Sequence, residues 1–256
     1  TNYGILPGRL ISGAGENTPV PDSRPPLARI EAALGGAGLV LLGAFHAGLE
    51  NSVPAFSAQH STATIVLAGN GGGSMWPFFK DHATSGQHPL NAWSAELFAQ
   101  LATQFCARAV SPAEGPPYHP FQRWALRSGQ AFTSPIGILV HPEYGLWHSY
   151  RGALLFAERL ALPTPIERPN PCLACAEKPC QSTCPVDAFE PDNYDVKRCA
   201  GHIGGKKPRG KSTANDCFMT GCRARHACPV GRKYAYPPAQ AQFHMAAFVA
   251  KHGPQD

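Results

Sequence analysis

Long apolar stretches are absent from this chain, and charged residues are few. No run approaches the roughly 20 apolar residues that a membrane-spanning helix needs, and the first residues show neither the basic start nor the hydrophobic stretch of a secretory signal. Charged residues make up 15% of the chain and hydrophobic residues 43%, which argues against a disordered chain and supports a packed core. The net charge of +5 is too mild to indicate a nucleic-acid partner. We therefore expect a globular protein that neither spans a membrane nor binds nucleic acid.

Cysteine is concentrated in one part of the sequence. Eight of the nine cysteines fall in two blocks, each of which closes on Cys-Pro-Val. The first block has the spacing C-x2-C-x4-C-x3-C-P and consists of Cys172, Cys175, Cys180 and Cys184. The second block consists of Cys199, Cys217, Cys222 and Cys228. Two sets of four thiolates, each ending in Cys-Pro, are the ligand inventory of two [4Fe–4S] clusters of bacterial ferredoxin type.

The ligand sets are expected to cross between the two blocks. In two-cluster ferredoxins the cysteine that precedes proline ligates the other cluster. This rule assigns one cluster to Cys172, Cys175, Cys180 and Cys228, and the other to Cys184, Cys199, Cys217 and Cys222. The looser spacings of the second block leave the pairing open, and one site could hold [3Fe–4S] instead. Zinc is the main alternative, because C-x2-C also begins zinc sites.

Iron-binding thiolates also bear on the compartment. They need a reducing environment, which predicts a cytoplasmic location, whereas disulfides would require an exported protein. The neighbouring segment 204–211 (GGKKPRGK) is rich in basic residues. It is interpreted either as a solvated loop or as a docking surface for an acidic electron donor, such as a flavodoxin, or for a ferredoxin reductase.

A proline-rich connector divides the chain. Residues 162–171 contain four prolines in ten residues, which cannot continue a helix or a central strand. We predict an α/β or α+β sandwich at 1–161, a cysteine module at 172–238 and a tail helix within 239–256. Apolar patterns in the large domain predict helices at 27–34 and 90–109 and strands at 39–45, 64–68, 136–141 and 147–156. Cys106, on the second of these helices, is interpreted as a small buried hydrophobe.

A glycine-rich turn follows the predicted strand at 64–68. Gly71, Gly72 and Gly73 have no side chains, so their backbone N–H groups could approach phosphate or amide oxygens of a cofactor. The spacing matches neither the dinucleotide-binding motif nor the P-loop. A tight turn without a ligand is therefore the alternative interpretation.

The segment His141–Gly152 reads HPEYGLWHSYRG and leads into an apolar strand. It resembles the matching stretch of cobalamin-processing proteins of the CblC type. With a cysteine module downstream, the arrangement is similar to epoxyqueuosine reductases and reductive dehalogenases. This resemblance implies an α+β chain in which a nitroreductase-like domain precedes a ferredoxin-like two-cluster module. It also implies corrinoid contacts at His141, Tyr144, Gly145, Trp147 and Arg151. The alternative is that HPEYG is a β-turn and that Trp147 belongs to the core.

The resemblance indicates a function in redox chemistry. We expect low-potential electrons to pass through two [4Fe–4S] clusters to a base-off cobalamin, as in a corrinoid reductase or a protein that processes the upper ligand. Two alternatives are a dicluster electron carrier without corrinoid and a flavin-dependent reductase that holds FMN. A histidine ligand would oppose base-off reduction. We therefore interpret the candidate cobalt ligands as structural or surface residues, namely His46, His60, His82, His88, His119 and His148.

Overall fold

The computed structural model describes residues 24, 26–49, 52–82, 86–164, 166–190, 193–205 and 216–253. The basic residues of the expected docking loop, 206–211, lie outside this range. The fold combines helices with antiparallel sheets, which confirms the α+β class. None of the described helices combines the length and the apolar character that a membrane span requires.

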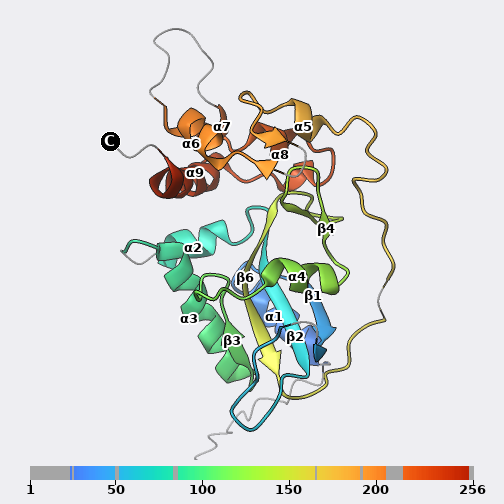
Figure 1. Ribbon diagram of the computed structural model, residues 1–256. Helices are drawn as coiled ribbons and strands as arrows, with labels where there is room; N and C mark the ends of the chain where they lie inside the picture. Colours follow the sequence, from blue (N-terminus) through green and yellow to red (C-terminus); the bar gives the residue numbers. More distant parts are fainter. Residues whose placement is uncertain are drawn as a thin grey trace, which may run out of the picture.

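A four-stranded antiparallel sheet forms the centre of the large part (Figure 1). Its order is β1 (Val40–His46), β2 (Thr64–Gly71), β6 (His148–Phe156) and β3 (Arg108–Val110). Every residue of β2 is buried, because this strand is central and both faces of the sheet are covered. Burial on both faces explains the continuous apolar run in the sequence of β2.

Helices cover the two faces unequally. On one face, Val66 and Ala68 pack with α1 (Pro26–Gly35), α2 (Trp76–His82) and α3 (Pro89–Gln104). On the other face, Ile65 and Leu67 pack with α4 (Phe121–Arg127). Successive side chains of a strand point to opposite faces, so one strand serves both cores.

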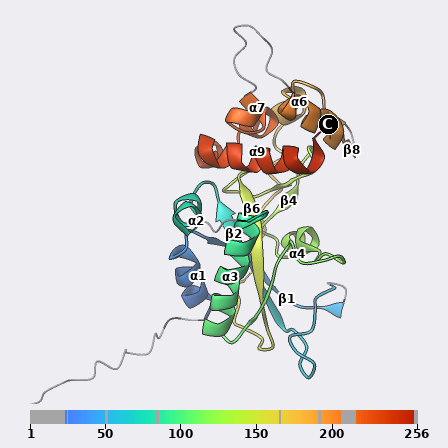
Figure 2. The ribbon, with the colours of Figure 1, turned by 90° about the vertical axis from the view of Figure 1, so that its left-hand side faces the viewer.

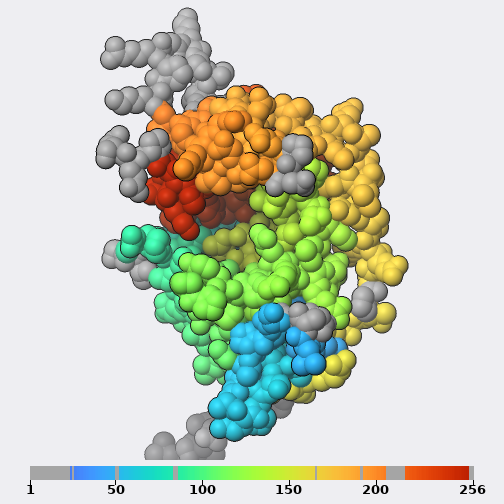
Figure 3. Space-filling view, viewed as in Figure 1, coloured from blue at the N-terminus to red at the C-terminus, as the bar shows by residue number. Residues whose placement is uncertain are grey.

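The cysteine-rich part lies at one end of this sheet (Figure 1). Its elements are short: α5 (Pro179–Ser182), β7 (Phe189–Glu190), β8 (Asn193–Tyr194), α6 (Val196–Gly204), α7 (Asp216–Met219), α8 (Arg223–Ala227) and η2 (Arg232–Tyr234). The longer α9 (Pro238–His252) lies between α6 and α7 and the large part (Figures 2 and 3). Phe243 of α9 contacts Trp76 and Phe79, with ring centroids 5.5 and 5.3 Å apart. The tail helix therefore joins the two parts.

Three predictions about the large part are wrong. The helix expected at 90–109 ends at Gln104. Cys106, expected to be a small buried hydrophobe, follows the helix in a left-handed conformation (φ 51°) and is exposed. The strand expected at 136–141 contracts to β5 (Leu139–Val140), which pairs with β4 (Phe132–Thr133). A turn closed by the bond from Gly137 N to Ser134 O occupies the start of that segment, with Gly137 at φ 77°. The described residues of the connector form neither helix nor strand.

Candidate functional site

The eight clustered cysteines lie in two groups of four. One small cavity is lined by Cys172, Cys175, Cys180 and Cys228. A second cavity is lined by Cys184, Cys199, Cys217 and Cys222. Each of the two cavities has a volume of about 20 Å³. The cysteine before proline in each block thus joins the cysteines of the other block. All nine cysteines lie among the described residues, and none forms a disulfide.

The thiols of each group influence one another electrostatically. Burial raises the pKa of Cys172, and repulsion from Cys228 and Cys180 raises it further. Burial raises the pKa of Cys217 to about 11, with a further contribution from Cys222. Four thiolates can therefore share such a cavity only if positive charge compensates them, as iron does.

The remaining walls of the two cavities are mostly apolar. Pro135, Pro171, Pro179, Pro229 and Val230 surround the first. Val186, Phe189, Ile203 and Ala224 surround the second. No three His, Cys, Asp or Glu side chains of the described residues are grouped around a point that suits a single metal ion. Four separate thiols around an apolar cavity fit a cluster in which each iron takes one thiolate.

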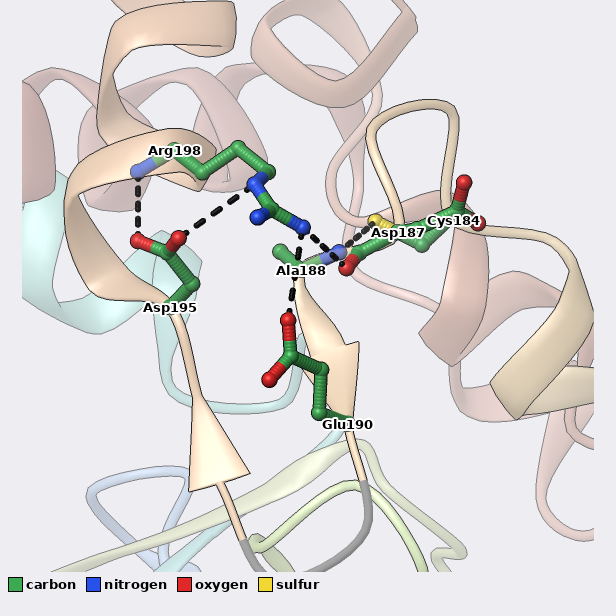
Figure 4. Close-up of polar contacts among 6 residues, drawn as sticks. All are labelled: Cys184, Asp187, Ala188, Glu190, Asp195 and Arg198. Atoms are coloured by element: carbon green, nitrogen blue, oxygen red, sulfur yellow. Dashed lines mark hydrogen bonds and ion pairs between the residues drawn. The ribbon is translucent and has the colours of Figure 1, made fainter.

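Hydrogen bonds support the second group of thiols. The N–H of Ala188 donates to Cys184 Sγ at 3.3 Å, and the Tyr194 hydroxyl bonds to Cys199. Arg198 joins the surrounding loop: its backbone N–H donates to Asp195 Oδ1 at 2.9 Å, and its Nη1 donates to Asp187 O at 2.9 Å (Figure 4). These bonds hold the segment that carries Cys184 against the start of α6.

A larger cavity of about 290 Å³ lies where β6 meets the cysteine-rich part. It is lined by Gln122, Ile138, Leu139, Leu146, His148, Ser149, Tyr150, Arg151, Arg225, Tyr236 and His244. The large part supplies an apolar wall and the start of β6, whereas α8, the segment after η2 and α9 supply the rest. Its mixture of apolar walls with a few polar groups is typical of small-molecule sites.

Polar groups in this cavity lack partners. The Tyr150 hydroxyl and Arg151 Nε are buried without a hydrogen-bond partner among the described residues. Burial raises the pKa of Tyr150 and lowers that of Arg151. The described lining contains two arginines and no carboxylate. Since buried donors are normally satisfied, these groups suit a ligand that presents acceptor oxygens.

Two histidines of the cavity are held neutral. Burial lowers the pKa of His148 to about 4. Burial, together with the charges of Arg151 and Arg225, lowers the pKa of His244 to about 3. At neutral pH both rings therefore act as neutral imidazoles.

Arg225 connects the larger cavity to the second group of thiols. Its Nε donates to Leu146 O at 3.0 Å, and its guanidinium lies over the rings of Trp147 and Tyr236. Burial raises the pKa of Cys222, while the charge of Arg225 and a bond from its backbone N–H oppose that rise. One side chain thus lies beside a thiol and in the wall of the cavity.

The residues predicted by resemblance lie mainly between the two parts. Arg151 lines the cavity. His141 and Gly145 bond to each other through both backbone groups and close a turn. A Cβ on Gly145 would overlap the carbonyl oxygen of Val230, so this turn packs against the end of the second cysteine block. Trp147 is fully buried. For Tyr144 and these three residues the structure shows a packing role, and cofactor binding stays a prediction.

The three predicted glycines likewise contact the chain itself. A Cβ on Gly71 would meet the ring of Tyr144, one on Gly72 would meet Tyr234, and one on Gly73 would meet Pro237. The absence of side chains therefore permits close packing of the cysteine-rich part on the turn after β2. Ligand binding at these glycines stays a prediction.

Sequence reasoning missed several residues of the cavity. The sequence predicts a structural or surface role for His148, whereas this residue lines the cavity, as does Tyr150. His148 and Tyr150 are two residues apart on a predicted strand, so their side chains point to the same face of the sheet. This spacing is the one sequence signal that connects them. Arg225, Tyr236 and His244 come from separate elements, and no local spacing connects them with β6.

No protein-family model and no curated protein matches the chain. Among solved structures, an epoxyqueuosine reductase from Bacillus subtilis is similar, with 18% identity and a TM-score of 0.44 over 69% of this chain and 51% of that one. The B12-trafficking protein CblC of C. elegans is similar with 12% identity and a TM-score of 0.47 over 88% of this chain and 96% of that one. The chain thus spans about half the length of the reductase. These similarities are too loose to carry an argument about function, which has to come from the residues of this chain.

Proposed function

We propose that this protein passes low-potential electrons through two [4Fe–4S] clusters to an acceptor bound in the cavity beside β6, and that the acceptor is a base-off corrinoid. The observation that carries the proposal is the grouping of the eight thiols into two quartets, with Arg225 adjoining both Cys222 and the larger cavity. When bound, such clusters supply one-electron carriers whose potentials reach about −700 mV at the reducing end of their range.

The chain's own residues would hold and tune these groups. The prolines around the first quartet and the apolar side chains around the second exclude water, which favours low potentials. The bonds from Ala188 and Tyr194 orient two of the thiolates. Nitroreductase-like and ferredoxin-like architectures for the two parts are proposed on the same basis.

The larger cavity suits a corrinoid in two respects. Ile138, Leu139 and Leu146 offer apolar surface to a flat macrocycle. The unpartnered donors of Tyr150 and Arg151 suit amide or phosphate oxygens at its edge. The same arginines would suit the phosphate of FMN, which is the second candidate. We further propose a cytoplasmic location and an electron donor of the flavodoxin or ferredoxin reductase class.

The decisive experiment is anaerobic purification followed by titration with cob(II)alamin. We expect about eight iron and eight sulfide per chain and saturable conversion of the cobalamin to its base-off spectrum. Arg151→Gln should weaken binding, whereas Arg159→Gln, at an exposed position on the same segment, should not. Zinc in place of iron would contradict the clusters. The absence of saturable binding would contradict the corrinoid, and release of a yellow fluorescent cofactor on heating would establish the flavin.

A further inference from the structure

The loop between Cys172 and Cys175 presents an apolar surface to solvent. Leu173 and Ala174 lie between these two thiols, and both are exposed, Leu173 to 82%. Ala176, directly after Cys175, is exposed as well. Both thiols are half-buried, so the first quartet lies close to the surface under this loop. Single exposed leucines are common on protein surfaces, but this one lies between two ligands of a proposed redox centre.

Hydrogen bonds fix the backbone of this loop. Asn170 Oδ1 accepts from the N–H of Cys172 at 2.9 Å, and Asn170 O accepts from the N–H of Leu173 at 3.0 Å. Asn170 Nδ2 donates in turn to Thr133 O, at the end of β4, at 3.1 Å. The loop is therefore tied to the large part, and Leu173 is held in an exposed position. A partner that binds to such a preformed surface has less conformational entropy to remove.

Cations surround the first quartet. Lys178 lines its cavity, and Arg232 Nε donates to the carbonyl oxygen of Cys228 at 3.3 Å. The segments 172–178 and 228–234 together carry three cations and one carboxylate, namely Lys178, Arg232, Lys233 and Glu177. An apolar centre with positive surroundings fits a partner whose own redox group is ringed by carboxylates.

The second quartet has the opposite charge in the segment 184–199. This segment carries four carboxylates and two cations. One of the cations, Arg198, is paired with Glu190 at 3.5 Å and with Asp195 at 3.3 Å (Figure 4). The segment therefore repels an acidic partner, which makes the first quartet the better point of entry.

We propose that an acidic one-electron carrier of the flavodoxin class docks on the loop 172–178, so that electrons enter at the first quartet, an inference that rests on the proposed function. One electron leaves the anionic hydroquinone of the carrier's FMN and enters the first cluster, without bond cleavage or proton transfer. It continues to the second quartet, where Arg225 adjoins both Cys222 and the larger cavity. Electron-transfer contacts are small, which suits a few exposed apolar side chains with a charged rim. The segment 204–211, expected from the sequence to serve this purpose, is the competing surface.

The test uses the full-length protein with its clusters and a reduced flavodoxin. Stopped-flow absorbance measures the second-order rate of cluster reduction, and an NMR titration of oxidised, ¹⁵N-labelled flavodoxin measures binding without electron transfer. We expect Leu173→Glu to lower the rate about tenfold and to weaken binding, whereas Leu173→Lys should lower both less. The wild-type rate should fall as the ionic strength rises.

Two controls separate docking from damage to the cluster. Leu49→Glu makes the same substitution at an exposed leucine, after the end of β1 that points away from the cysteine-rich part, and it should leave the rate unchanged (Figure 1). Dithionite, a small reductant that needs no docking surface, should reduce the clusters of all variants at similar rates.

Each other outcome has a definite meaning. An unchanged flavodoxin rate in L173E would overturn the docking site and leave the proposed function intact. A loss confined to the double variant K206Q/K207Q would assign docking to 204–211 and overturn the proposal. Equal losses in L173E and L173K, with slower reduction by dithionite, would trace the effect to the cluster itself and overturn the docking role. A preparation without iron would overturn the proposed function and this inference together. Failure to bind cobalamin, with the expected loss in L173E, would overturn the corrinoid and support the docking site.

Discussion

The guanidinium carbon of Arg225 lies 4.4 Å from the centroid of the Trp147 ring. The same group lies 4.9 Å from the ring of Tyr236 and bonds to the carbonyl of Leu146. Three residues earlier in the sequence is Cys222, whose thiol responds to the charge of Arg225. Through these contacts Arg225 joins α8 to the large part, and it places a positive charge beside the second quartet.

Removing that charge should lower the potential of the second cluster. A positive charge stabilises the reduced, more negative cluster, so Arg225→Met should shift its midpoint potential downward by an amount on the order of tens of millivolts. Arg225→Lys keeps the charge but loses the planar stacking, and should shift the potential less. Redox titration monitored by electron paramagnetic resonance measures both. Equal shifts in the two variants would show that the charge is not the cause.

Tyr194→Phe should act on the same cluster through a hydrogen bond. The hydroxyl bonds to Cys199, and such bonds to cluster sulfurs raise the potential, so its loss should lower the midpoint. The stacking of this ring on Phe189, at 5.0 Å, should remain. Phe189→Leu, which removes the stacking and keeps the hydroxyl, is the matched control. A midpoint that moves in the control but not in Y194F would contradict the role of the bond.

The crossing of the two quartets can be tested by paired substitutions. Cys228 lies with Cys175, so the double variant C175S/C228S should lose no more iron than C175S alone. Cys184 belongs to the other quartet, so C175S/C184S should lose iron from both clusters. Iron and sulfide analysis of anaerobic preparations measures the difference. The reverse pattern would mean that each sequence block holds its own cluster.

Gly145→Ala should separate the two parts or prevent folding. Gly145 has φ 57°, and an added Cβ would overlap the backbone of Val230. We expect the free energy of unfolding to fall by more than about 3 kcal/mol. Gly137→Ala is the control, because Gly137 has φ 77° and open space around its Cβ position. It should cost only the backbone strain, about 1 kcal/mol. Similar losses in denaturant titrations of the two variants would rule out the contact with Val230 as the cause.

Acid should lower the free energy of unfolding, because His244 is buried as a neutral imidazole in the folded protein. The pKa of His244 is about 3 in the folded protein and about 6.5 when the ring is exposed to water, so below pH 6.5 the unfolded state binds more protons than the folded state. The stability is complete above pH 6.5 and falls progressively as the pH is lowered towards 3. Denaturant titrations at neutral and mildly acidic pH should show this slope. His244→Gln should reduce it, and an unchanged slope in H244Q would contradict the assignment.

Sequence patterns predicted the elements whose neighbours are local. The apolar stripe of residues 90–104 and the buried run of β2 follow directly from helical and strand periodicity. The pattern continued past Gln104, but the left-handed conformation of Cys106 ended the helix there. The cysteine quartets were predictable because the spacing encodes them. The larger cavity was not, because Tyr150, Arg225 and His244 converge only after β6 and the cysteine-rich part have packed together.

The crossed quartets also have a consequence for biogenesis. The second quartet lies wholly between Cys180 and Cys228, so it is nested inside the segment that the first quartet closes. During translation Cys222 emerges before Cys228, and the inner site therefore has all its ligands first. We therefore expect the cluster of the second quartet to be inserted first. The cluster of the first quartet should follow, because it needs Cys228, the last of the eight thiols to leave the ribosome.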